Sequence, residues 1–230
     1  MAYNAFFNYL PKDDINIIFE IGANNGNDSA IICNYFKPKE YHIFEPTEQN
    51  FKILQSRFSN NKSCNFFLNN NAVYTHNGKN KFYICKSNSG ASSILGKVKP
   101  EFCKIADKEC NMPIQQHEKR LREYCTDIDW IPSEVNCIRL DTYCNDKKVT
   151  DIDLICIDVE GVGLSVLKSM GDRLKNVKYI ISECDYGVTR ENEETFEQIN
   201  KYLKEYDFEI VVNKFQVSVL SDCLWKNKLC

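Results

Sequence analysis

Two acidic residues end an apolar run in the segment DLICIDVEG, residues 153–161. Asp158 and Glu160 stand two residues apart there, and Glu183 ends a further apolar run. A positioned carboxylate can orient a hydroxyl group and accept its proton. A carboxylate cluster can instead hold a hard divalent cation. We predict that Asp158 and Glu160 are catalytic and treat Glu183 as a weaker candidate base. The alternative is that these carboxylates only cap the helix that follows.

A loop with two glycines follows the first apolar run. Glu20, Gly22 and Gly26 lie in its sequence EIGANNG. Glycines after a strand let a ligand approach the backbone closely, and the N-terminus of the next helix can face an anion. The spacing differs from the GxGxxG fingerprint of dinucleotide-binding proteins, so a purely structural turn is the alternative.

A third acidic residue ends the second apolar run. Glu45 follows Gly22 by 23 residues, close to the roughly 20-residue offset of a carboxylate that binds ribose hydroxyls. The alternative is an ordinary exposed glutamate before the helix cap Pro46-Thr47. Taken together, the glycine loop and Glu45 predict a cofactor that contains adenosine.

The elements that must position these residues alternate along the chain. Apolar runs typical of buried strands are followed by helical segments, the pattern of an α/β fold with a doubly wound, mostly parallel sheet. Strands are expected at 15–21, 41–45, 64–68, 81–85, 135–140, 153–158, 177–183, 208–212 and 216–220. Helices are expected at 30–36, from about 47 to 58, and at 115–124, 164–174 and 191–206.

Composition narrows the class of protein. The chain has 230 residues, a net charge of −3 and 12 cysteines, and we predict a single domain over 1–230 with an insertion at 97–135 that shapes the acceptor site. The start lacks the pattern of a signal peptide, and no apolar run is long enough to cross a membrane, so a cytoplasmic location is expected. The charge argues against a nucleic-acid partner. The scattered cysteines are expected to be reduced and mostly apolar core residues.

An ordered set of motifs resembles the FkbM family of S-adenosylmethionine-dependent methyltransferases over roughly residues 15–220. The matching segments are EIGANNG at 20–26, IFEP at 43–46, NAV at 71–73 with Gly78, SSI at 92–94, IRLD at 138–141, DLICIDVEG at 153–161 with Val166 and Leu167, and IISE at 180–183. Glu20 stands where the family more often has aspartate.

The resemblance implies a Rossmann-like class I methyltransferase fold with a seven-stranded, mostly parallel sheet whose last strand is antiparallel. It also implies S-adenosyl-L-methionine as cofactor and methyl transfer to a hydroxyl oxygen of a sugar, a glycan or another small metabolite. By position, the cofactor-binding residues would be Glu20, Gly22, Asn24 and Gly26 with Ser29 nearby for the methionyl part, Glu45 for the ribose, Asn71 and Ala72 for the adenine, and Asp158 with Glu160 where the methyl group meets the acceptor. Gly22→Val is expected to abolish binding by occupying the cofactor's place.

Three other functions stay open. The first is a methyltransferase assisted by a divalent ion, held by Asp158, Glu160 and Glu183 or Asp185; no metal site is otherwise predicted. The second is a ribose-directed nucleic-acid methyltransferase, and the third is a non-catalytic cofactor-binding module. The sequence does not predict the oligomeric state.

Features near the insertion have two interpretations each. His117 could act as a base but is more often a solvated helix residue. The basic cluster Lys119, Arg120 and Arg122 could contact an acidic acceptor or form a solvated helix face. The small residues 87–93 could form a mobile lid or a plain surface loop.

Overall fold

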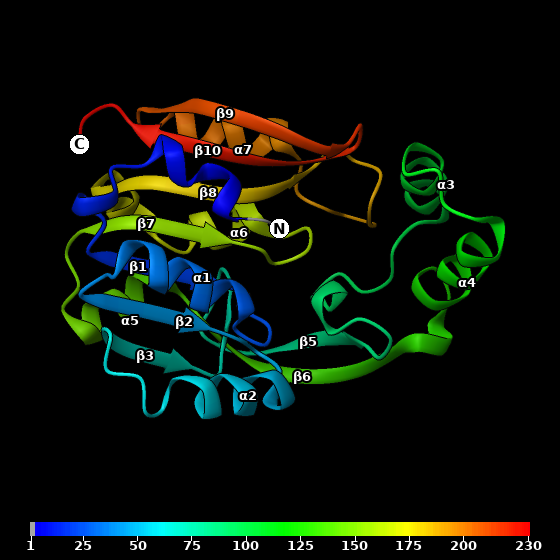
Figure 1. Cartoon of the computed structure of the whole chain (residues 1–230), viewed down its shortest axis with the longest axis horizontal. Helices are drawn as coiled ribbons and strands as arrows, with labels where there is room; N and C mark the ends of the chain where they lie inside the picture. Colours follow the sequence, from blue (N-terminus) through cyan, green and yellow to red (C-terminus); the bar gives the residue numbers. More distant parts are fainter. Residues whose placement is uncertain (1–2) are drawn as a thin grey trace.

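The computed structural model describes residues 3–230, and a seven-stranded sheet forms its centre (Figure 1). The strand order is β3-β2-β1-β7-β8-β10-β9, and only β10 runs antiparallel to its neighbours. This is the seven-stranded, mostly parallel sheet with an antiparallel last strand that was expected from the sequence. The strands are β1 (Ile17–Ile21), β2 (Glu40–Phe44), β3 (Asn65–Asn69), β7 (Ile152–Ile157), β8 (Val177–Asp185), β9 (Phe208–Val217) and β10 (Leu220–Asn227).

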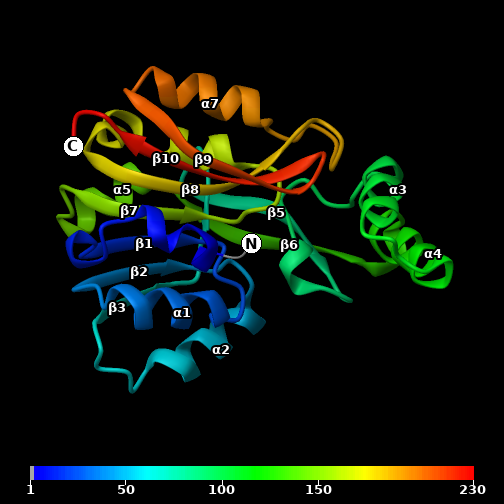
Figure 2. The same cartoon turned by 45° about the horizontal axis from the view of Figure 1, so that its top comes forward.

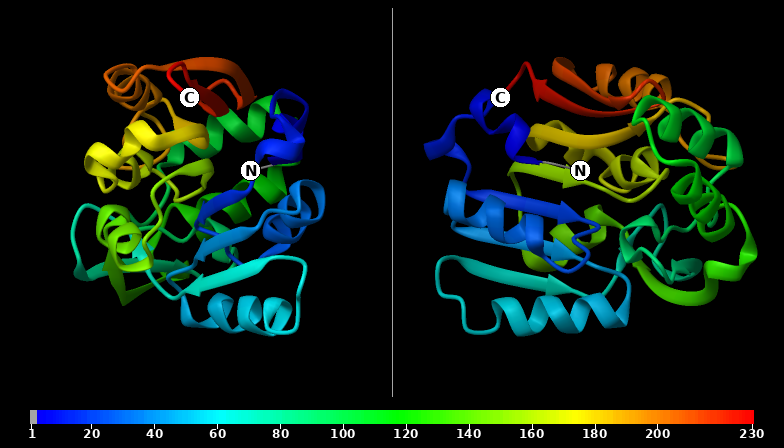
Figure 3. Two further views of the ribbon diagram at one scale, coloured as in Figure 1. Left: turned by 90° about the vertical axis from the view of Figure 1, so that its left-hand side faces the viewer. Right: turned by 45° about the vertical axis from the view of Figure 1, so that its right-hand side comes forward.

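Helices cover both faces of this sheet. One face carries α1 (Asn27–Phe36) and α2 (Glu48–Phe58), and the other carries α5 (Leu140–Lys147), α6 (Gly163–Lys168) and α7 (Phe196–Lys204). Figure 3 shows α2 along the β3 end of the sheet and α7 at the β9 end.

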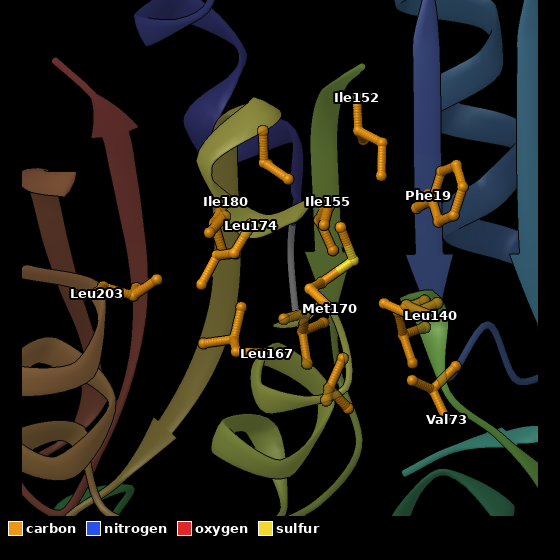
Figure 4. Packing of buried hydrophobic residues seen from close by; sticks show 14 of the residues in the cluster. Phe19, Val73, Leu140, Ile152, Ile155, Leu167, Met170, Leu174, Ile180 and Leu203 are labelled. Carbon is orange, nitrogen blue, oxygen red and sulfur yellow. The ribbon is translucent and has the colours of Figure 1, made fainter. Parts of the chain in front are cut away.

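Alternate residues of each central strand enter opposite cores. Phe19 and Ile155 pack with α5 and α6 (Figure 4), whereas Ile18 and Leu154 pack with α1 and α2. Burial on both faces explains why β1 and β7 read as continuous apolar runs.

A second, three-stranded sheet was not predicted. It has the order β4-β6-β5 and consists of β4 (Ala72–Val73), β5 (Gly78–Cys85) and β6 (Trp130–Ile138). Strands β5 and β6 are antiparallel and extend beyond the carboxyl edge of the main sheet (Figure 1).

The predicted insertion forms two helices that project from this ribbon. They are α3 (Pro100–Glu109), which was not predicted, and α4 (Ile114–Tyr124), which was; Figure 2 shows them packed together at one end of the molecule. Asp107 of α3 is almost fully buried and pairs with both His117 and Arg120 of α4. The interpretation of α4 as a plain solvated face is therefore wrong for His117 and Arg120, because a buried carboxylate requires such partners.

Several predicted ends need correction. The strand expected at 208–212 is the start of the longer β9. The strand expected at 216–220 is wrong, because residues 216–217 end β9, residues 218–219 form a turn, and β10 begins only at Leu220. The helix expected from 191 begins at Phe196, where Thr195 and Gln198 form a capping box. The helix expected at 164–174 is α6 followed by a 3₁₀ turn, Gly171–Asn176. Helix α5 was not predicted.

Eight of the twelve cysteines are buried and all twelve are free thiols. The buried ones pack as apolar core residues, as expected. Among residues 3–230, no helix is both long and apolar enough to cross a membrane.

Candidate functional site

Two adjoining cavities open at the carboxyl edge of the main sheet. The first, here called the apolar cavity, has a wall formed by Pro46, Ala72, Val73, Phe82, Ile94, Val159 and Val162, with Glu45 and Asn71 also lining it. The second, here called the acidic cavity, is lined by Tyr3, Glu20, Asp28, Asp158 and Glu160 and by the asparagines 24, 25, 27 and 88. Gly22, Asn24, Gly90 and Asp158 line both. Parallel strands place their carboxyl ends together, so the loops after β1, β2 and β7 meet there.

Glu45 is held rigidly at the end of β2. It is 4% exposed, and its Oε2 accepts a hydrogen bond from the backbone N–H of Asn24 at 2.9 Å. Its Oε1 accepts from the backbone N–H of Thr47 at 2.8 Å and from the Thr47 hydroxyl at 2.5 Å. Burial raises the pKa of Glu45, and these donors partly offset that rise. The carboxylate is thus a fixed acceptor on the wall of the apolar cavity.

Glu20 lies beneath the glycine loop at the end of β1. It is 1% exposed, and the Tyr41 hydroxyl donates to its Oε2 at 2.6 Å. Burial raises the pKa of Glu20 to about 7, although the Ser29 and Tyr41 hydroxyls act in the opposite direction. Glu20 therefore changes its charge near neutral pH.

The two glycines of the loop serve the fold directly. A Cβ at Gly22 would lie 1.9 Å from the backbone oxygen of Asp158, and a Cβ at Gly26 would lie 2.5 Å from Leu54 of α2. Both residues have positive φ, 87° and 77°. Gly22 therefore allows the ends of β1 and β7 to approach each other. A side chain at this position would collide with the backbone of Asp158, in addition to the expected collision with the cofactor. Gly26 lines neither cavity and lets α1 begin close to α2.

The remaining predicted cofactor residues are divided between the two cavities. Asn24 lines both and accepts a hydrogen bond from the Ser89 hydroxyl at 3.0 Å. Asn71 and Ala72 follow β3 and line the apolar cavity. Ser29 lines neither cavity, because it is buried in α1 beside Glu20.

The predicted catalytic carboxylates do meet. Asp158, Glu160 and Glu183 each offer an oxygen within 4.8 Å of the others. Burial raises the pKa of Glu160 to about 7, with Arg190 acting to lower it and Asp158 to raise it. Burial, Asp158 and Glu160 also raise the pKa of Glu183 well above its usual range. Three carboxylates at this separation can share a proton or accept one.

Arg190 and Tyr3 are among the residues of this site that were not predicted. Arg190 is 2% exposed and pairs with Glu160 at 2.7 Å, and Tyr3 lines the acidic cavity. Neither lies in a recognisable motif. The sequence alone does not show that Arg190 is buried, because its partner Glu160 lies 30 residues earlier in the chain.

Residues 87–93, here called the covering loop, contribute to the walls of both cavities. It contains a 3₁₀ turn, Ser89–Ala91, and the Ser93 hydroxyl donates to the backbone oxygen of Glu160 at 2.7 Å. Ser89, Gly90 and Ser92 line the apolar cavity. By contrast, His117 lines neither of the two cavities.

The chain is similar to several known proteins. Residues 20–210 match the FkbM methyltransferase domain. The chain is 22% identical to the 2-O-methyltransferase NoeI of Sinorhizobium fredii over 230 residues, which are 98% of this chain and 85% of that protein. One solved structure that resembles it is TrmK of M. capricolum with S-adenosylhomocysteine, with a TM-score of 0.49 and 8% identity over 98% of this chain and 67% of that one. Another is the fibrillarin of Aeropyrum pernix with S-adenosylmethionine, with a TM-score of 0.48 and 10% identity over 97% of this chain and 72% of that one. The chain belongs to the FkbM family of S-adenosylmethionine-dependent methyltransferases.

Proposed function

We propose that this methyltransferase transfers its methyl group to a hydroxyl oxygen of a sugar, a glycan or another small metabolite. The observation that carries the proposal is the carboxylate cluster of Asp158, Glu160 and Glu183, two members of which line the acidic cavity. A hydroxyl is a weak nucleophile and benefits from a positioned base. The similarity to a protein named as a 2-O-methyltransferase supports an oxygen acceptor.

The two cavities fit the parts of the cofactor. Its neutral adenine suits the apolar wall of Pro46 and Ala72, and its ribose diol suits the fixed carboxylate of Glu45. Its sulfonium and ammonium groups suit a cavity lined by several carboxylates. When bound, the cofactor supplies an electrophilic methyl group. The cofactor-binding residues of this proposal are those expected from the sequence, except that Gly26 and Ser29 line neither cavity and would act only by holding the loop and α1 in place.

We assign the role of base to Asp158. It lines both cavities, so a hydroxyl between them lies within its reach. Glu160 forms an ion pair with Arg190. It would orient the acceptor by accepting a hydrogen bond from the acceptor's hydroxyl group. Holding the hydroxyl oxygen about 3 Å from the reacting carbon supplies much of the rate.

The insertion would act through the covering loop. Ala91 of that loop packs in the same apolar cluster as Val98, Phe102 and Trp130. Since α3 and α4 line neither cavity among the described residues, the insertion would shape the acceptor site from behind segment 87–93. The whole chain would act as one domain.

The test is a methyl-transfer assay with labelled cofactor on nucleotide sugars, oligosaccharides and RNA. Turnover on a saccharide that survives a chelator supports the proposal. Turnover only on RNA would favour the ribose-directed alternative, and loss in chelator with recovery by a divalent ion would favour an ion at the carboxylate cluster. Binding of S-adenosylhomocysteine without turnover on any acceptor would favour a non-catalytic module.

A further inference from the structure

Tyr3 lines the acidic cavity and comes from outside the matched domain. It begins a 3₁₀ helix, Tyr3–Tyr9, whereas the family match covers residues 20–210. The helix is anchored by apolar contacts: the Phe7 ring stacks on Tyr35 at 4.4 Å and meets Phe36 edge-on at 4.9 Å. Lys214 donates to the backbone oxygen of Ala5 at 2.6 Å. The position of Tyr3 is therefore built into the fold.

The Tyr3 hydroxyl has no hydrogen-bond partner although it is buried. The residue is 2% exposed, and its oxygen is among the buried polar atoms left unpaired. Leaving a buried hydroxyl unpaired costs free energy, and nearly all such groups in proteins find a partner. Because Tyr3 lines the acidic cavity, its unpaired hydroxyl points to a ligand there that accepts its hydrogen bond.

The surroundings of Tyr3 define the chemistry of that ligand. Burial raises the pKa of Tyr3 well above its usual range, and Asp158, Glu20 and Asp28 raise it further. The phenol therefore stays protonated and acts as a donor. In a cavity rich in carboxylates, a ligand cation finds acceptors easily, but a ligand anion needs the few donors that are present.

We propose that Tyr3 donates a hydrogen bond to the carboxylate of the cofactor's methionyl part. The carboxylate is the one anionic group of that cofactor, and the acidic cavity is where its ammonium group would also lie. The inference rests on the proposed placement of the cofactor. It adds a binding residue from the segment before the matched domain.

The test compares Tyr3→Phe with Tyr9→Phe by calorimetry. Tyr9 lies in the same helix and is 48% exposed, so its variant is a matched control. The two ligands are S-adenosylhomocysteine, which carries the carboxylate, and 5′-methylthioadenosine, which lacks the amino-acid part. Tyr3→Phe should weaken binding of S-adenosylhomocysteine by about tenfold, as expected for a hydrogen bond to a charged group. Binding of 5′-methylthioadenosine should not change.

Stability gives a second readout. Without ligand, the melting temperature of Tyr3→Phe should equal or exceed that of the wild type, because an unpaired buried hydroxyl has been removed. Equal weakening of both ligands, or weakening of neither, would overturn the role of Tyr3, and so would a change confined to the acceptor KM. If the wild type binds the two ligands equally well, the placement of the cofactor itself is wrong.

Discussion

Nη2 of Arg190 lies 2.7 Å from Oε2 of Glu160, in an ion pair that also holds the covering loop. The same guanidinium donates to the backbone oxygen of Ala91 at 2.9 Å and to that of Gly96 at 3.2 Å. Glu160 has a φ of 58°, which is unusual for a residue with a side chain. Arg190, which lies in the loop before α7, thus binds both the carboxylate of Glu160 and the backbone of the chain at Ala91 and Gly96.

Arg190→Ala should lower activity and shift its pH dependence. Burial has already raised the pKa of Glu160 to about 7, and loss of the cation should raise it further. If transfer needs ionised Glu160, the acidic limb of the pH–rate profile moves to higher pH, and kcat/KM at pH 7 falls on the order of tenfold. Arg190→Lys should restore part of both. Breaking the buried pair should also cost about 3 kcal/mol of stability.

The matched control for Arg190 is Arg122→Ala, which removes an exposed arginine of α4. It should leave the pH–rate profile and stability nearly unchanged. A profile for Arg190→Ala that keeps its wild-type midpoint would contradict the electrostatic role and leave only a structural one.

Asp158→Asn should lower kcat by roughly 100-fold or more, because a positioned base contributes at least that much. The amide keeps the size of the side chain but cannot accept the proton. Binding of S-adenosylhomocysteine, measured by calorimetry, should weaken far less than kcat. Asp151→Asn, at the exposed position before β7, is the control. Unchanged kcat in Asp158→Asn would remove Asp158 as the base and direct attention to Glu183.

Glu20 should make the ligand-free protein less stable as the pH rises. Its pKa is about 7 in the folded protein, above the ordinary value of 4.5. The folded state therefore holds a proton that the unfolded state releases, and the stability due to protonated Glu20 is lost between about pH 4.5 and pH 7. Glu20→Gln should remove this dependence and exceed the wild type by about 3 kcal/mol at pH 8 but not at pH 4.

Thermal unfolding at several pH values measures the effect of Glu20. Glu48→Gln, an exposed position in α2, is the control. Since the ionised form suits a cationic ligand, Glu20→Gln should also weaken cofactor binding. A pH dependence that is identical in wild type and Glu20→Gln would show that Glu20 titrates as an ordinary carboxyl.

Gly22→Ala should prevent stable folding, whereas Gly187→Ala should not. Both glycines have a φ of 87°, so each alanine carries the same backbone strain of about 1 kcal/mol. At Gly22 the new Cβ also meets the backbone oxygen of Asp158 at 1.9 Å, and at Gly187 it meets nothing within 4 Å. The collision should add about 3 kcal/mol or more. Equal melting temperatures for the two variants would be inconsistent with this packing.

The sheet could be predicted wherever burial leaves a clear pattern. Strands β1 and β7 are covered on both faces, so each reads as an unbroken apolar run. The edge strand β9 is largely exposed, and its polar residues hid its true length. The short strand β4 and the sheet it forms with β6 depend on pairing between residues 72–73 and 137–138, which no local pattern reveals.

The same division holds for the site. Glu20, Glu45 and Asp158 each lie at or beside the end of a strand, and parallel strands bring their carboxyl ends together. The sequence by itself therefore determined that these carboxylates lie along one edge of the sheet. Only the tertiary structure decided that Arg190 pairs with Glu160 and that Tyr3 lines the acidic cavity. The physical reason is that these contacts depend on how segments far apart in the chain pack against one another. The role of a buried charge or hydroxyl depends on the groups that it contacts, and those groups come from distant parts of the chain.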